Sequence, residues 1–356
     1  MKIVIPLLEF GKGGGHRVLI KLANEWVKLG HEVTYITFEY SALPNFPYKA
    51  QIIWIDFFGK RVASNKINCK RIPYQYFYTR YSLLKAINKY AKDADILLAN
   101  HSLTAFPVYK SSVKARKFYY VQAYEPEYYS NLGLKSLIYK RPSQASYIYN
   151  LNTIVNCELY LNYKEIKTNM FVYPGIDLEN FYSKDFSSYK IKEKWILGCV
   201  GRVEKFKGTQ YVIDAFLKLK KQHNDIELHI AFGDNNLAEV EGIRIVYPKD
   251  DAELADFYRS VDIIIAPGTV QLGAIHYPVL EAFACGTSVI NTGYSKADIT
   301  NSYIIPINDS DSIVNQVKSI MKDTEQAKSK IVAAKMVLPK FEWKEVAAKM
   351  LYYFKN

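Results

Sequence analysis

Residues 2–38 decide the fold class, and they read KIVIPLLEFGKGGGHRVLIKLANEWVKLGHEVTYITF. An apolar, β-prone run at 2–8 leads into a glycine loop, Gly11-Lys-Gly-Gly-Gly-His-Arg17. Between Val18 and Val27 the apolar residues recur at the spacing of one helix face, and a second β-prone run follows at 33–38. Strand, loop, helix and strand in this order predict the opening βαβ unit of a parallel sheet.

The same alternation continues through both halves of the chain. In the first half we predict strands at 51–55, 95–99, 117–121, 152–155 and 171–177, and a loop plus a helix over 60–81. After a polar linker at 178–194 we predict strands at 196–201, 227–232, 243–247, 262–266 and 287–292, and helices over 211–219, 252–260, 278–285 and 343–354. Repeated βα units in each half predict an α/β fold of two Rossmann-like domains, 1–178 and 179–339.

The composition excludes several classes of protein. Of the 356 residues, 49% are hydrophobic and 23% are charged, which is enough to pack two cores and excludes a disordered chain. The apolar runs are too short to span a bilayer, and the first residues lack the long apolar region of a signal peptide. The four cysteines, at 69, 157, 199 and 285, are scattered. They predict neither a zinc site nor a disulfide framework, and they favour a cytoplasmic location.

The net charge of +12 is confined to the first half of the chain. Residues 1–178 contain 24 Lys and Arg against 12 Asp and Glu, whereas residues 179–356 contain 23 of each. Together with the tyrosines of this half, the clusters at 60–80 and 110–117 predict peripheral binding to an anionic membrane, at the inner face of the cell membrane. A solvated basic face and steering of an anionic substrate are the alternatives. Nucleic-acid binding would rest on charge alone, so none is predicted.

Three loops follow predicted strands at the edge where open α/β sheets bind ligands. The first contains Gly14 and Gly15 and opens a helix, so it fits either an anion or a tight turn of positive φ. The second runs from Gly201 to Gly208 and carries Arg202 and Lys207, two cations suited to a diphosphate. A transferase that works without a metal must neutralise this charge in its leaving group.

The third loop leads into a predicted helix at 278–285. Pro278 suits a first helical turn, where free N–H groups would face an anion. Glu281 is expected in that same turn, where it would bind a ribose diol or merely cap the helix dipole. No Asp-x-Asp pair or Ser-His-Asp arrangement is evident, so neither a metal nor a nucleophilic triad is predicted.

These stretches together resemble the retaining GT-B glycosyltransferases of family 4. The resemblance rests on four stretches in the right order and spacing: Gly13–Gly15, Tyr173-Pro-Gly-Ile-Asp-Leu-Glu-Asn-Phe181, Val200-Gly-Arg-Val-Glu-Lys-Phe-Lys-Gly208 and Pro278-Val-Leu-Glu-Ala-Phe-Ala-Cys-Gly-Thr287. It implies two domains facing each other across a deep cleft, with a C-terminal helix at 340–356 that crosses back onto the first domain. It also implies a nucleotide-sugar donor and no bound cofactor.

The resemblance implies roles for individual residues. Arg202 and Lys207 would hold the donor diphosphate, and Glu281 would bind the nucleotide ribose. The remaining donor contacts are expected from Gly14, Gly15, Gly201 and the helix start at Tyr277, Pro278, Val279 and Leu280. The acceptor would be a saccharide or a lipid-linked saccharide, held mainly by the first domain.

Two departures from the family pattern concern the site. A family glutamate that contacts the transferred sugar is replaced by Gly273. The family's histidine in the first domain has no match, and Gln122 or Glu125 is expected to replace it, with His16 and His101 as further candidates on the acceptor side. Gly-Gly-Gly-His-Arg17, Val-Gln-Ala-Tyr-Glu-Pro126 and His-Tyr-Pro-Val-Leu-Glu281 resemble a subgroup with rhamnosyltransferases of surface polysaccharide assembly.

The leading expectation is therefore a retaining glycosyltransferase that moves a hexose or deoxyhexose in cell-surface glycan assembly. A non-catalytic subunit that stabilises a partner transferase is the alternative, motivated by Gly273 and the missing histidine. An NAD-dependent oxidoreductase is disfavoured because His16 stands at the last glycine position of the GxGxxG motif.

Overall fold

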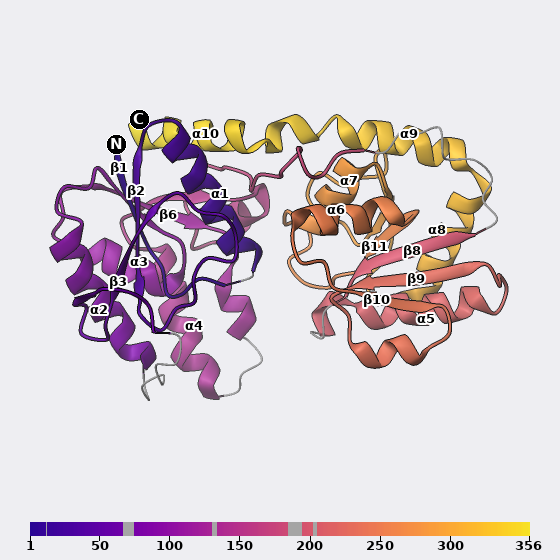
Figure 1. Ribbon diagram of the computed structural model, residues 1–356, viewed down its shortest axis with the longest axis horizontal. Helices are drawn as coiled ribbons and strands as arrows, with labels where there is room; N and C mark the ends of the chain where they lie inside the picture. Colours follow the sequence, from indigo (N-terminus) through magenta and orange to yellow (C-terminus); the bar gives the residue numbers. More distant parts are fainter. Residues whose placement is uncertain (12, 67–74, 130–133, 184–193, 202–204) are drawn as a thin grey trace. The chain divides into compact units, whose positions relative to one another are not determined.

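The computed structural model describes residues 1–11, 13–66, 75–129, 134–183, 194–201 and 205–356 (Figure 1). They form two compact units: unit 1 comprises Met1–Gly175 with Trp343–Asn356, and unit 2 comprises Ile176–Glu342. The first division lies three residues before the expected boundary at 178, and the second lies three residues after 339. Part of the expected linker, 184–193, lies outside the described residues.

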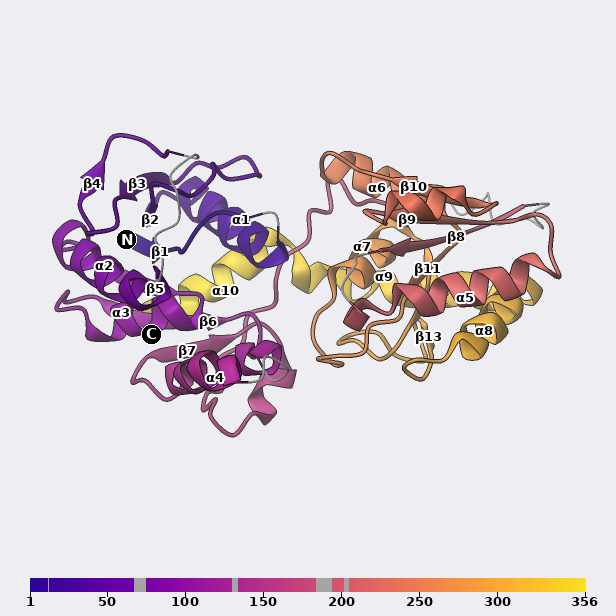
Figure 2. The same ribbon diagram turned by 90° about the horizontal axis from the view of Figure 1, so that it is seen from below.

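Unit 1 is built on a seven-stranded sheet of order β4-β3-β2-β1-β5-β6-β7, in which only β4 is antiparallel to its neighbour (Figure 2). The strands are β1 Lys2–Pro6, β2 Glu32–Phe38, β3 Gln51–Ile55, β4 Arg61–Val62, β5 Ile96–Ala99, β6 Arg116–Val121 and β7 Asn152–Val155. The helices are α1 Gly14–Lys28, α2 Gln75–Tyr90, α3 Ser102–Lys110, α4 Leu134–Tyr147 and α10 Trp343–Lys355, with short 3₁₀ turns at Glu125–Tyr129 and Glu158–Asn162.

One predicted strand of unit 1 is wrong. Residues 171–177 form two isolated bridges, Phe171 with Val155 and Ile176 with Glu342, and no continuous strand. Pro174 lies between the two bridges and has no N–H group to donate to a neighbouring strand, so the pairing does not continue through it.

The apolar face of α1 is buried in the core of unit 1, and α10 completes this core. Trp26 of α1 is fully buried, and its indole N–H donates to the Ala347 carbonyl of α10 at 3.3 Å. The ring of Phe354 lies 5.4 Å from that of Trp26 and 4.8 Å from that of Phe118 on β6. Aromatic rings bury large apolar areas, so α10 is a structural part of unit 1 (Figure 2).

The two chain segments that leave and re-enter unit 1 run beside each other. A Cβ atom added to Gly175 would lie 2.4 Å from the Trp343 ring, so the glycine backbone packs directly on the indole. One residue further on, within unit 2, the Ile176 N–H donates to the Phe341 carbonyl at 2.7 Å.

Unit 2 is built on a fully parallel sheet of order β10-β9-β8-β11-β12-β13. The strands are β8 Trp195–Val200, β9 Ile226–Ala231, β10 Ile243–Val246, β11 Ile263–Ala266, β12 Ser288–Asn291 and β13 Tyr303–Ile304. The helices are α5 Thr209–Lys220, α6 Asp251–Ser260, α7 Tyr277–Cys285, α8 Ser310–Lys322 and α9 Thr324–Lys335, with 3₁₀ turns at Lys205–Lys207, Asn235–Glu239 and Leu338–Phe341.

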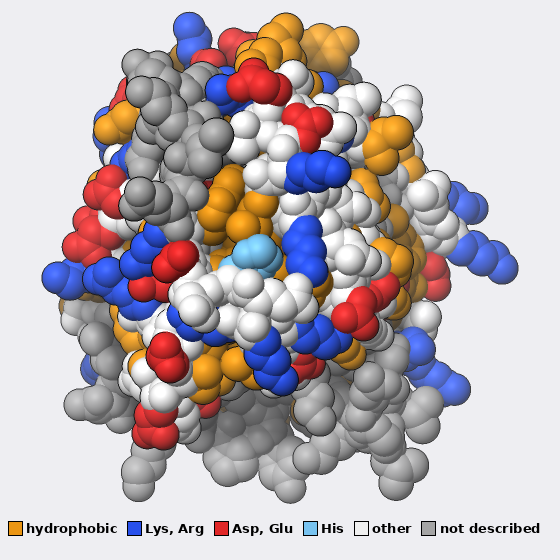
Figure 3. All heavy atoms as spheres, turned by 90° about the vertical axis from the view of Figure 1, so that its right-hand side faces the viewer, with side chains coloured by type: hydrophobic (Ala, Val, Ile, Leu, Met, Phe, Trp, Pro, Cys, Tyr) orange, Lys and Arg blue, Asp and Glu red, His pale blue; other side chains and the backbone are white. Residues whose placement is uncertain are grey.

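The described part of the chain was compared with what a membrane span and a single-sign charged face would require. None of the described helices is both long and apolar enough to cross a bilayer. On the face drawn in Figure 3, basic and acidic side chains are interspersed.

Candidate functional site

Each sheet has one point where the strand order reverses, and ligands of open α/β sheets bind beyond the carboxyl ends of the strands there. In unit 1 this point lies between β1 and β5, and in unit 2 it lies between β8 and β11. The loops after β1 and β8 are the first and second loops singled out in the sequence. The topology therefore brings each glycine loop to the reversal point of its own unit.

In unit 1, the glycines after β1 make room for side chains. Gly13 is the N-cap of α1 with φ −70°, and neither Gly14 nor Gly15 has positive φ, so the tight-turn interpretation is wrong. A Cβ on Gly11 would lie 3.0 Å from the His16 ring, and one on Gly15 would lie 3.4 Å from Gln122 Oε1. The loop thus accommodates one imidazole and one carboxamide.

His16 is a neutral base candidate. Burial lowers its pKa, the Glu9 carboxylate opposes that change, and His101 adds to it. Its Nδ1 atom is buried and has no hydrogen-bond partner among the described residues. A buried unpaired nitrogen costs free energy unless a ligand or water satisfies it, so His16 is available to a ligand.

Glu125 is occupied by contacts within unit 1. It is 8% exposed, and its Oε1 accepts the Ser102 backbone N–H at 3.0 Å, at the start of α3. Its Oε2 lies 3.5 Å from His101 Nε2, and His101 Nδ1 accepts the Leu103 N–H at 3.1 Å. Because Nδ1 accepts, the ring hydrogen of His101 lies on Nε2, facing Glu125. Glu125 and His101 together stabilise the first turn of α3.

Gln122 is better placed for a ligand than Glu125. Its side-chain Oε1 is buried and without a hydrogen-bond partner among the described residues. Its backbone carbonyl accepts the Asn156 amide at 3.2 Å and the Tyr160 hydroxyl at 3.3 Å, which fixes the end of β6. The sequence alone predicted Gln122 and Glu125 as equal candidates. The contact that engages Glu125 joins it to Ser102, 23 residues away, and has no sequence signal.

In unit 2, two glycines hold the loop after β8 against its neighbours. A Cβ on Gly201 would lie 2.3 Å from Ile230 Cγ2, so the first residue of this loop packs tightly on β9. Gly208 has φ +73°, and its Cβ would lie 2.2 Å from the Pro267 carbonyl oxygen after β11. Lys207 lies between them, with Nζ 5.4 Å from the Phe206 ring centre. Arg202 lies outside the described residues.

Helix α7 starts one residue earlier than predicted, and this changes the place of Glu281. Since α7 begins at Tyr277, Glu281 is its fifth residue, so the expected position in the first turn is wrong. Glu281 is 2% exposed, and its Oε2 accepts the Tyr258 hydroxyl at 2.8 Å. Capping of the helix dipole is therefore not its role, whereas ribose binding stays a prediction.

Among the residues at the α7 start, Pro278 lies in the first turn as expected from the sequence. The Val279 and Leu280 side chains are buried, and both N–H groups donate to the His276 carbonyl. These two residues pack the helix and do not present their side chains to a ligand.

Gly273 occupies a position that a glutamate would strain. Its φ is +86°, and its N–H donates to the Gly293 carbonyl at 2.8 Å. Next to it, the His276 ring stacks on Tyr294 with centres 4.0 Å apart, and burial raises the pKa of Tyr294 to about 12. The loop after β11 is thus held closely on the loop after β12.

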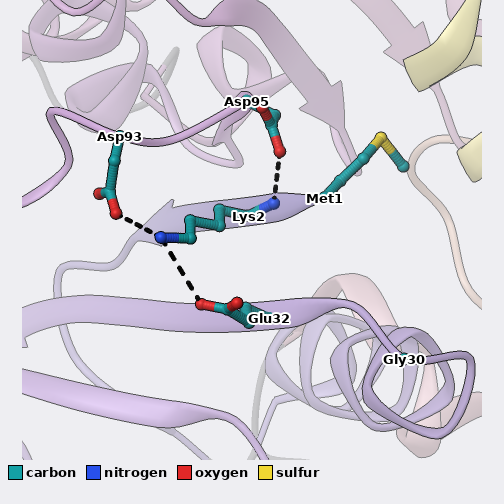
Figure 4. A pocket seen from close by; sticks show the side chains of 6 residues that line it. All are labelled: Met1, Lys2, Gly30, Glu32, Asp93 and Asp95. Carbon is teal, nitrogen blue, oxygen red and sulfur yellow. Dashed lines mark hydrogen bonds and ion pairs between the residues drawn. The ribbon is translucent and has the colours of Figure 1, made fainter.

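A hollow of about 290 Å³ lies at the other edge of the unit 1 sheet (Figure 4). Its lining comes from residues at and just before the starts of β1, β2 and β5. Among them, Lys2 Nζ lies 2.5 Å from Asp93 and 4.0 Å from Glu32. The Asp93 interaction raises the pKa of Lys2 and lowers that of Asp93. Ligands bind at the carboxyl edge of such sheets, so this hollow is not the candidate site.

Comparison with solved structures decides the fold. Sucrose-phosphate synthase of Thermosynechococcus elongatus superposes with a TM-score of 0.77 at 16% identity, covering 100% of this chain and 98% of that one. Anabaena HepE, solved with UDP and glucose, gives 0.73 at 14% identity and covers 100% of both chains. The chain has the GT-B fold. The expected fold class is confirmed, and at these identities the likeness concerns the fold alone.

Sequence comparisons give one family match, which lies within unit 2. Residues 194–323 match the family described as "Glycosyl transferases group 1". D-inositol 3-phosphate glycosyltransferase of Corynebacterium jeikeium is 32% identical over 33% of this chain and 32% of its own. Lipopolysaccharide 1,2-N-acetylglucosaminetransferase of Salmonella typhimurium is 26% identical over 45% and 48%. The matches thus span between a third and a half of the length of these two relatives.

Proposed function

We propose that this GT-B protein is a retaining glycosyltransferase that moves a hexose or deoxyhexose from a nucleotide-sugar to a saccharide or lipid-linked acceptor in cell-surface glycan assembly. The observation that carries the proposal is the loop after β8. Gly201 and Gly208 admit no side chain, Lys207 lies between them, and the loop precedes the N-terminus of α5 within the stretch that matches the family. Such a loop suits a diphosphate.

Unit 2 would bind the donor. Lys207, with Arg202 as the resemblance implies, would neutralise the diphosphate as it leaves, and Glu281 would bind the ribose. Because HepE was solved with UDP and with UDP-glucose, we propose a UDP-sugar as the first donor to test.

The transfer step needs no cofactor and no metal in this proposal. The bond from the anomeric carbon to the diphosphate oxygen breaks, and the acceptor oxygen bonds to the same face of that carbon. The acceptor proton passes to the departing diphosphate oxygen. Neutralisation by cationic side chains is what replaces a metal here, so full activity in EDTA is the expected result.

Unit 1 would bind the sugar and the acceptor through Gln122 and His16. Both present a buried polar atom without a partner among the described residues. Glu125 and His101 would act only by fixing α3. The proposal also includes a deoxyhexose such as rhamnose as the transferred sugar, because the motifs around His16 and Glu281 resemble those of rhamnosyltransferases.

A patch on unit 1 supports the proposed binding to an anionic membrane at the cytoplasmic face. We define this aromatic–basic patch by its rings and by the cation of Lys110: Phe57, Phe58, Tyr78, Tyr81, Phe106, Tyr109, Lys110 and Tyr149. The Arg80 guanidinium lies over Phe106 with its Nε and Nη2 atoms buried. Phe58 is 66% and Tyr81 is 60% exposed, although exposed aromatic rings are costly in water. Rings of this kind sit at the headgroup level while Lys and Arg attract anionic lipids.

Co-sedimentation with vesicles of phosphatidylglycerol and phosphatidylcholine tests the membrane proposal. Binding should occur at low salt, weaken at high salt, and fall in Phe58→Ser/Tyr81→Ser. Pelleting with pure phosphatidylcholine to the same extent, or no pelleting at all, would refute it.

Thermal-shift measurements with UDP, GDP and ADP, followed by assays of donor hydrolysis with the matching nucleotide-sugars, test the enzymatic proposal. A true ligand raises Tm by mass action. The second candidate, a non-catalytic subunit, is favoured by Gly273 and would bind without hydrolysis or transfer. Absence of binding to every nucleoside diphosphate would refute the donor site.

A further inference from the structure

Phe232, directly after β9, has a backbone conformation that its side chain disfavours. Its φ is +60°, a left-handed value that bulky L-residues rarely adopt. Four non-glycine residues have positive φ among the described residues, at positions 232, 271, 296 and 308. Each follows a strand of unit 2, so this strain is concentrated at the carboxyl edge of one sheet.

The surrounding loop leaves Phe232 no freedom to relax. Its N–H donates to the Val246 carbonyl at 2.8 Å. The next residue, Gly233, would bring a Cβ within 2.7 Å of Ile230 Cγ2, and its carbonyl accepts the Tyr247 hydroxyl at 2.5 Å. The loop therefore imposes the left-handed backbone on whatever residue stands at position 232.

Burial does not explain a phenyl ring at this position. Phe232 remains 39% exposed, and a glycine would adopt the same φ without strain. Strained residues persist where the surrounding structure holds them, and they gather at functional sites. A partly exposed ring on a rigid, strained loop offers a flat apolar surface to a ligand.

The backbone around position 232 lies beside Gly201, where the loop proposed to hold the diphosphate begins. β8 and β9 are neighbours, the Gly201 N–H donates to the Ala231 carbonyl at 2.9 Å, and a Cβ on Gly201 would lie 3.5 Å from the Gly233 Cα. In a nucleotide-sugar bound over the β8 loop, the diphosphate joins two groups, the transferred sugar and the nucleoside. Of its parts, only the nucleobase is a flat aromatic ring that stacks on a phenyl group.

We propose that Phe232 is the stacking platform for the nucleobase of the donor. The inference rests on the proposed function and specifies one residue of its donor site. The protein accepts the strain because the ring contributes binding affinity. Stacking is tolerant of base identity, so Phe232 sets nucleotide affinity more than the choice among bases.

The test compares Phe232→Gly, Phe232→Ala and Phe232→Trp with the wild type. Calorimetric Kd values are measured for UDP and for inorganic pyrophosphate, and Tm is measured without ligand. Base–aromatic stacking is typically about 1–3 kcal/mol, which converts to about 5- to 150-fold in Kd. We expect Phe232→Gly and Phe232→Ala to weaken UDP binding by about tenfold or more, with pyrophosphate unchanged and Phe232→Trp close to wild type.

Tm separates a ligand platform from a packing role. Phe232→Gly removes the strain, so its Tm should equal or exceed that of the wild type. Asn308→Gly is the matched control: it relieves the same kind of φ, +58°, after the distant β13, and should leave UDP affinity unchanged.

Two outcomes overturn the inference. One is unchanged UDP affinity in Phe232→Gly, and the other is a marked fall in its Tm with equal losses for UDP and pyrophosphate. If the wild type binds neither UDP nor pyrophosphate, the proposed function fails as well, so the two failures are distinguishable.

Discussion

Replacing Gly208 with alanine should unfold the proposed diphosphate loop. The residue has φ +73°, and a left-handed backbone costs an alanine about 1–2 kcal/mol. The added Cβ would also lie 2.2 Å from the Pro267 carbonyl oxygen, and backbone shifts forced by such overpacking cost about 1–3 kcal/mol more. The expected loss is about 2–5 kcal/mol, a large share of the stability of a domain.

Gly30→Ala is the matched control because it isolates the conformational part of that cost. Gly30 has a similar φ of +81°, but nothing lies within 4 Å of its added Cβ. Hydrogen exchange at the amides of β8 and α5 reports the local stability of unit 2, and exchange at α1 reports that of unit 1. Equal losses in Gly208→Ala and Gly30→Ala would refute the contact with Pro267 as the cause.

Three further predictions concern the site. Lys207→Ala should lower the kcat of sugar transfer on the order of a hundredfold with unchanged Tm, because one electrostatic contact to developing charge is worth that much. A kcat near that of the wild type would exclude Lys207 from binding the diphosphate. Gln122→Ala should lower kcat while leaving Tm unchanged, whereas Glu125→Gln should lower Tm through α3, and the reverse pattern would contradict the assignment. Burial lowers the pKa of His16 in the folded protein, so the unfolded chain binds the proton more readily. Stability from this group is therefore present above about pH 6.5 and is lost as pH falls below it. His16→Gln should flatten that dependence in urea titrations between pH 5 and 8, and an unchanged slope would refute it.

Strand positions followed directly from the apolar runs because fully buried parallel strands are nearly continuous in Val, Ile and Leu. β3 and β7 have the predicted bounds, and β5 and β6 differ from prediction by one residue. The position of the two glycine loops at the carboxyl edges of the sheets was also predictable, because it follows from the order of strands and helices alone.

Side-chain roles were less predictable because they depend on contacts distant in sequence. In the sequence Glu125 resembles a free carboxylate, because its partners Ser102 and His101 lie in a different part of the chain. Glu281 was expected in the first turn because Pro278 suggested the helix start, but α7 begins at Tyr277, so Glu281 follows the first turn. The left-handed backbone at Phe232 has no signature in the residue type, since the loop around it imposes the angle.

The adjacency of Gly175 and Trp343 has a consequence for synthesis on the ribosome. Unit 2 is inserted into unit 1, so α10 is translated only after all of Ile176–Glu342. At translation speeds of about 5–20 residues per second, that interval lasts roughly 8–35 s. Unit 1 waits through it with the Trp26 surface uncovered, whereas unit 2 is complete as soon as it emerges. The nascent chain is therefore most vulnerable to aggregation and chaperone capture through unit 1.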